Sequence, residues 1–158
     1  MTRSLAIFLT LLVYGCGSDV PTESREPFIS RIIVRKSETI LIGLNRLYPG
    51  QFQLRDVSIA ADSIRFNYFL SGSFEVSDGF SMEAFLMRKE DVPAIVAGEE
   101  VERVWRSGVA NSAAWEFGVP QGGDYTFVLD NRVGEAEWKS ITSRLVMSWD
   151  ESVPVLNP

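Results

Sequence analysis

The chain has 158 residues, with 15 basic and 21 acidic side chains, one cysteine and no histidine. The absence of histidine excludes Ser-His-Asp and Cys-His catalysis and every metal site that needs a histidine ligand. The net charge of −6 argues against binding to a phosphate backbone, so we expect no nucleic-acid partner. A single cysteine forbids an internal disulfide, and the domain must therefore be stable through its core.

The N-terminus has the pattern of an export signal. Arg3 is the only charged side chain before Cys16, and an apolar run extends from Leu5 to Val13. A positive region, an apolar region and then small residues are the order of a signal peptide. The run is about half of the roughly 20 apolar residues that a spanning helix needs. The alternative is an N-terminal helix or strand buried in a cytosolic domain.

The stretch Val-Tyr-Gly-Cys at 13–16 resembles the lipobox of bacterial lipoproteins. The resemblance implies that residues 1–15 are removed and that Cys16 carries the lipid. Gly17 follows the cysteine where an Asp would tend to retain a Gram-negative lipoprotein at the inner membrane, so the outer membrane is favoured. The alternative for Cys16 is a free reactive thiol, which would need an activating base nearby.

Four segments follow from this organisation. They are a signal peptide at 1–15, the lipidated cysteine with a polar tether at 16–27, one domain at 28–150, and a short tail at 151–158. The tether is polar and contains two prolines.

Alternating apolar residues and regular turn signals predict short strands in the domain. The expected strands span 31–34, 39–44, 52–59, 64–70, 74–76, 81–87, 115–119, 125–129 and 141–149. Residues 89–104 break the pattern and predict one helical turn or a long connection. Many short strands with little helix indicate an all-β fold, an antiparallel β-sandwich or barrel.

The second half contains "GGDYTFVLDN" at 122–131, followed by a lysine that opens the last strand. With the strands around it, this segment resembles the GOLD-type β-sandwich of Golgi-dynamics and secretory cargo-adaptor proteins and of scattered bacterial proteins. The resemblance covers roughly residues 64–149. The matching positions are Gly123, Tyr125, Val128, Asp130, Asn131 and Lys139. The resemblance implies a GOLD-like or jelly-roll-like sandwich that makes protein–protein or lipid contacts without catalysis.

The same residues also have an ordinary structural interpretation. Gly123 permits a tight turn, and Tyr125 buries its ring and offers its hydroxyl to a corner. Asp130 and Asn131 can bind nearby backbone amides and so close a strand. We therefore expect a structural corner at these positions.

The four tryptophans divide into two pairs. Trp115 and Trp149 lie on apolar alternating faces and are expected in the core. Trp105 and Trp138 have charged neighbours and are the candidate binding surface, since an exposed tryptophan can stack on a sugar or anchor a protein partner. Partial burial under the long connection is the alternative for this second pair.

Catalysis would have to rely on carboxylates, which a glycosidase holds about 5 to 10 Å apart across a cleft. The candidates lie in two loops: Glu99, Glu100, Glu102, Glu135 and Glu137. Calcium could be bound through Asp78, Asp124 or Asp130, but the chain lacks a spaced calcium loop. We expect solvated loop charges, no enzyme, no metal and no cofactor.

The sequence thus predicts a lipid-anchored envelope lipoprotein whose β-sandwich binds a protein partner. A carbohydrate- or cell-wall-binding sandwich is the second hypothesis, and a small carboxylate hydrolase is the third.

Overall fold

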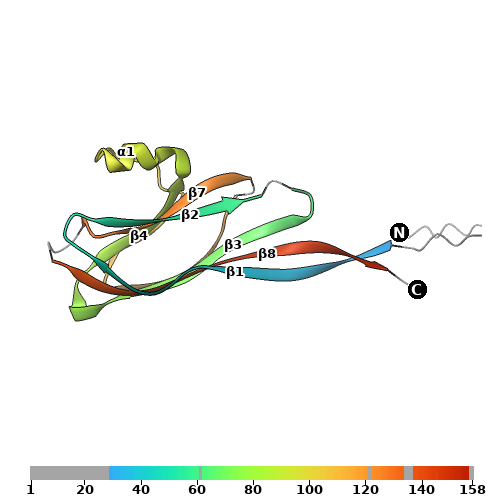
Figure 1. Ribbon diagram of the computed structural model, residues 1–158, viewed down its shortest axis with the longest axis horizontal. Helices are drawn as coiled ribbons and strands as arrows, with labels where there is room; N and C mark the ends of the chain where they lie inside the picture. Colours follow the sequence, from blue (N-terminus) through green and yellow to red (C-terminus); the bar gives the residue numbers. More distant parts are fainter. Residues whose placement is uncertain (1–28, 61, 121, 134–136, 157–158) are drawn as a thin grey trace, which may run out of the picture.

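The computed structural model describes residues 29–60, 62–120, 122–133 and 137–156. In these residues the strands form two antiparallel sheets of four strands each (Figure 1). The first sheet has the order β1 (Ile29–Leu47), β8 (Lys139–Leu156), β3 (Arg65–Val76), β6 (Ser112–Gly118). The second sheet has the order β2 (Phe52–Ile59), β7 (Gly123–Asp130), β4 (Met82–Arg88), β5 (Trp105–Ala110). The expected all-β antiparallel sandwich is therefore confirmed.

Several strands are longer than the apolar alternation predicted. β1 is one strand where two were expected, because its polar middle pairs with β8 through the backbone in an almost unbroken register. Residues 151–156 continue β8 and do not form the expected tail. β3 joins two expected strands, and its register shifts between Phe66 and Phe69, around Asn67 with its φ of 52°. Ile64, the first residue of the strand expected at 64–70, precedes β3 and is exposed.

The main core lies between the sheets. Alternate residues of β3, β7 and β8 meet there, and the fully buried ones include Leu70, Tyr125, Phe127, Ile141 and Leu145. The two tryptophans expected in the core, Trp115 and Trp149, are half-buried and pack against this cluster.

A second, smaller core covers the outer face of the second sheet. The expected helical turn forms as a 3₁₀ turn at Lys89–Asp91 followed by α1 (Val92–Val96), which has Pro93 in its first turn. Ile95 of α1 is buried with Phe85, Met87 and Val128. This cover explains why β4 and β7 are buried on both faces, so that neither shows a clean alternation.

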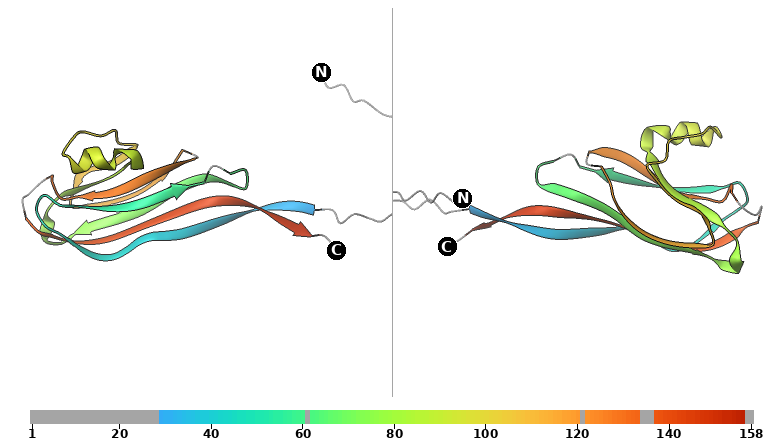
Figure 2. Two further views of the ribbon diagram at one scale, coloured as in Figure 1. Left: turned by 45° about the horizontal axis from the view of Figure 1, so that its top comes forward. Right: turned by 180° about the vertical axis from the view of Figure 1, so that it is seen from behind.

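The first sheet is longer than the second. Beyond Glu151, β8 pairs only with β1, apart from one hydrogen bond from the Ser152 amide to the Ile64 carbonyl at 2.9 Å. The two strands project from the sandwich as a ribbon made of Ile29–Ile33 and Ser152–Leu156 (Figures 1 and 2). Both ends of the described chain lie at the tip of this ribbon. The turn between β1 and β2 and the segment before β8 lie at the opposite, distal end. Within the described residues, no helix has the length and apolar character needed to cross a membrane.

Candidate binding surface

Asn131 holds the distal end together. Its side chain is buried, and its amide nitrogen donates to the carbonyl oxygens of Leu47 (3.1 Å), Tyr48 (3.0 Å) and Glu137 (3.0 Å). These bonds fix the end of β1 and the segment before β8 against the end of β7. The neighbouring surface is therefore a rigid one, since its backbone is tied at three points.

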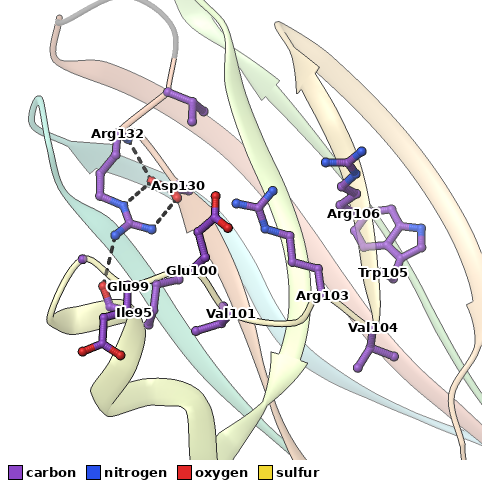
Figure 3. Close-up of a pocket in the computed structure, with 12 residues that line it drawn as sticks. Ile95, Glu99, Glu100, Val101, Arg103, Val104, Trp105, Arg106, Asp130 and Arg132 are labelled. Carbon is purple, nitrogen blue, oxygen red and sulfur yellow. Dashed lines mark hydrogen bonds and ion pairs between the residues drawn. The ribbon is translucent and has the colours of Figure 1, made fainter.

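The residues on either side of Asn131 form an ion pair. The Arg132 guanidinium donates to both carboxylate oxygens of the buried Asp130 at 2.9 and 2.7 Å, and its third nitrogen reaches the Ile95 carbonyl at 3.1 Å (Figure 3). The hydrogen bonds to Asp130 raise the pKa of Arg132 above its ordinary value. A bidentate arginine–carboxylate pair is among the stronger polar contacts in proteins. Through its additional bond to the Ile95 carbonyl, this pair fixes α1 to the sheet.

A second buried carboxylate lies beside the first. Glu83 of β4 is directly opposite Asp130 in the register of β4 and β7, and only 3% of its surface is exposed. Arg103 binds Glu83 at 3.1 Å and stacks over the Phe85 ring. Directly opposed residues on antiparallel strands have Cβ atoms about 5 Å apart. The two carboxylates thus form a pair, and each is bonded to its own arginine.

Asp130 and the two arginines line an open pocket of about 860 Å³, which we call the arginine pocket (Figure 3). Its walls come from α1, the segment after it, the start of β5 and the end of β7. The principal lining side chains are Ile95, Glu100, Arg103, Trp105, Arg106 and Arg132. The buried carboxylates are already bonded to arginines, and one of these arginines also binds α1. The arrangement is therefore better suited to holding the α1 segment in place than to acid–base chemistry.

Exposed apolar side chains gather instead at the distal end of β1. Ile42 (72% exposed), Leu44 (66%) and Arg46 alternate along one face of this edge strand. The Arg46 guanidinium lies 5.6 Å from the centre of the Trp138 ring, which is 50% exposed. Tyr48, 62% exposed, completes a small cavity of about 190 Å³ with Arg46, Leu47 and Trp138. We call Ile42, Leu44, Arg46, Tyr48 and Trp138 the distal stripe.

The two tryptophans expected as a binding surface have different environments. Trp105 is half-buried in the arginine pocket. Its ring stacks on that of Phe117, with ring centres 4.7 Å apart, and is tilted by 39° to that of Trp115, with ring centres 5.0 Å apart. Trp138 is exposed in the distal stripe. The two tryptophans therefore do not form one surface. Trp105 is partly buried, which was the alternative given for this pair.

The other candidate residues are also spread out. Tyr125, at the end of β7 away from Asp130, donates weakly to the Pro120 carbonyl at 3.4 Å, and Gly123 opens that strand. Lys139 is buried at the start of β8 and donates to the Ser81 carbonyl. Cys16 lies outside the described residues.

The loop carboxylates weighed as catalytic candidates, and expected to be solvated, lie in solvent wherever the structure describes them. Glu99, Glu100, Glu102 and Glu137 are exposed, and Glu135 lies outside the described residues. The buried pair of Glu83 and Asp130 was missed, because it comes from two strands far apart in the sequence.

Two of the three calcium candidates cannot share an ion. Asp124 and Asp130 lie at opposite ends of β7, on the order of 20 Å apart along the strand. Asp124 accepts a hydrogen bond from Ser58 at 2.6 Å, and the Asp78 side chain is outside the described part. In that part, His, Cys, Asp and Glu side chains form no group of three or more that could hold a metal.

Comparisons with known proteins return distant structures only. No protein-family model matches the chain, and no curated protein matches its sequence. One similar structure is PliG of Aeromonas hydrophila, a periplasmic inhibitor of g-type lysozyme, with a TM-score of 0.38 and 12% identity over 75% of this chain and 85% of that one. Another is from the disulfide-linked pili of Bacillus endospore appendages, with a TM-score of 0.32 and 13% identity over 81% and 91% of the two chains. Similarities this low assign no function.

Proposed function

We propose that this protein is a lipid-anchored, non-catalytic domain whose distal stripe binds a protein partner in the cell envelope. The stripe is the observation that carries the proposal. It places exposed tryptophan, tyrosine and arginine side chains beside two exposed aliphatic ones on a rigid corner. Tryptophan, tyrosine and arginine are the residue types that dominate binding hot spots, and contiguous apolar patches mark interaction surfaces.

The anchor is the lipid that the lipobox-like sequence places on Cys16. The described domain begins at the ribbon, and the stripe lies at the other end of β1. An anchor before the ribbon would therefore hold the stripe away from the membrane, within reach of an envelope protein. Gly17 after the cysteine favours the outer membrane in an organism that has one.

A non-catalytic role agrees with the chemistry of the pocket. The chain has no histidine, and the paired carboxylates of Glu83 and Asp130 are each bonded to an arginine. The GOLD-like resemblance supports the same role.

Introducing a charge into the stripe tests the binding surface. We expect Leu44→Asp to abolish recovery of a specific partner after chemical cross-linking in cells, because the interface would have to bury a carboxylate in place of an apolar side chain. Val109→Asp is the matched control, since Val109 is 57% exposed on β5 outside the stripe. Equal recovery of the partner by both variants would refute the assignment of the stripe.

A carbohydrate or cell-wall ligand is the second candidate. The rings of Tyr48 and Trp138 flank the 190 Å³ cavity, and exposed aromatic rings can stack on sugars. Sedimentation with peptidoglycan separates the two functions, since binding that Trp138→Ala abolishes would favour the sugar ligand.

A further inference from the structure

The ribbon is rich in apolar residues, and two of its isoleucines are exposed. Of its ten residues, Arg31 is the only charged one, in a chain that carries −6 overall. Ile32 is 50% exposed and Ile33 is 67% exposed. The ribbon is the first part of the domain after the proposed anchor. We therefore ask what covers its exposed apolar side chains.

The exposed side chains point in opposite directions. Ile32 pairs across the ribbon with Val153, and Ile33 pairs with Ser152. Successive residues of a strand point to opposite faces, so the two isoleucines lie on the two sides of the ribbon. One flat protein surface could bury only one of them, whereas a fluid apolar medium that surrounds the tip buries both.

The backbone of the ribbon limits how deep it can go. Two strands alone have two open edges, and unpaired backbone groups are costly inside hydrocarbon. Five residues of strand span about 17 Å, which is shorter than the roughly 30 Å hydrocarbon core. The ribbon therefore suits the headgroup region and its boundary with the acyl chains, where open edges still meet water and headgroups.

The length of the tether limits how far the ribbon can lie from the membrane that holds the lipid. Twelve residues separate Cys16 from Ile29, and they can span at most about 40 Å. Arg31, on the same face as Ile33, suits this position, because an arginine can extend its charged end to lipid phosphates.

We propose that the ribbon is a second membrane contact, inserted into the interface of the bilayer that holds the Cys16 lipid. This proposal rests on the proposed anchor. The protein then touches the membrane through its own strands as well as through lipid, and the long axis of the sandwich points away from the surface. The distal stripe is thereby held outward in a defined orientation.

The test uses the lipidated full chain in vesicles of phosphatidylethanolamine and phosphatidylglycerol. Since the lipid would occupy Cys16, the only cysteine in the sequence, an introduced cysteine is the only free thiol. An environment-sensitive fluorophore is attached to Ile33→Cys or Ile32→Cys. Matched controls are Val109→Cys and Val96→Cys, whose parent side chains are 57% and 63% exposed on the body of the domain. Circular dichroism checks that each variant folds.

We expect labels at positions 32 and 33 to shift to shorter wavelength and to be quenched by doxyl-labelled lipids, and labels at 96 and 109 to do neither. Flotation with the vesicles is measured in parallel. Protein that floats while positions 32 and 33 stay unquenched would overturn the ribbon contact and leave the anchor standing. Protein that fails to float would overturn both. A blue shift without lipid quenching, growing with protein concentration, would assign the ribbon to a second copy of the chain and overturn the proposal.

Discussion

Gly72 offers a sharp test of how neighbouring strands of the first sheet pack, because it lies directly opposite Trp115 in the register of β3 and β6. A Cβ atom at this position of β3 would lie 2.7 Å from Cζ2 and 3.0 Å from Cε2 of Trp115, and it would also press on the Arg144 carbonyl oxygen. Carbon atoms normally approach to about 3.5–4.0 Å, so the indole would have to move by nearly 1 Å. The carbonyl cannot move aside, because β8 is paired on both sides there.

Overpacking of this kind costs about 1–3 kcal/mol. Replacing glycine by alanine also restricts the unfolded chain, which offsets about 0.4–1 kcal/mol. We therefore expect Gly72→Ala to lower the free energy of unfolding by about 1–2 kcal/mol, or the Tm by about 3–6 °C for a domain of this size. The measurement is thermal and urea unfolding followed by circular dichroism, in a Cys16→Ser background that removes the proposed lipid.

Gly118→Ala is the matched control. Gly118 lies on β6, the strand that pairs with β3, and its nearest neighbours to an added Cβ are both at 3.9 Å, an ordinary contact. Its free energy of unfolding should equal that of the wild type or exceed it by up to about 1 kcal/mol, because the restriction of the unfolded chain is not offset by a clash. If the two variants unfold together, the close packing of Trp115 on β3 is wrong.

Three further outcomes are expected. Arg132→Ala should cost about 3 kcal/mol in urea unfolding, because it leaves the buried carboxylate of Asp130 without a counter-charge and with the backbone amide of residue 132 as its remaining donor. A smaller loss in the double variant with Asp130→Asn would confirm the cause. The pKa of Asp150 is lowered by hydrogen bonds from Asn67 and Arg35, so the ionised carboxylate stabilises the fold at neutral pH. This stability is lost as the pH falls below about 4. Asp150→Asn should therefore flatten the acid part of a plot of the free energy of urea unfolding against pH. Trp138→Ala should leave the Tm unchanged, since the ring is half exposed, while it weakens partner binding.

The strands that alternate cleanly could be predicted from the sequence. Trp115 and Phe117 on β6, and Ile141, Leu145 and Met147 on β8, lie on the inner faces that their spacing indicated. The strands that were missed or cut short lack this pattern for physical reasons. The middle of β1 is polar, and β5 is interrupted by Gly108 at a φ of 75° and by a register shift opposite β4. Backbone pairing with a long neighbour supports such segments whatever their side chains.

The candidate surface was less accessible from sequence. Trp138 could be singled out by its charged neighbours, but its contact with Arg46 depends on a corner built by Asn131. Ile42 and Leu44 lie between Leu41 and Leu47 of β1, which are buried. Only the structure, with β1 at the edge of its sheet, shows that nothing in the described domain covers them. Arg132, which follows Asn131, is the residue that fixes α1 to the sheet, and its bond to the Ile95 carbonyl could not be read from the sequence.

Site-specific photo-cross-linking in cells would test the central claim most directly. A photoreactive amino acid would replace Leu44 or Trp138 in the distal stripe, and Val96 of α1, also exposed, would serve as the reference position. Cross-linking of one and the same protein from positions 44 and 138, but not from 96, is the result that this account predicts. Cross-linking of that protein from position 96 alone would contradict it, and the partner would then have to bind on the α1 side of the sandwich.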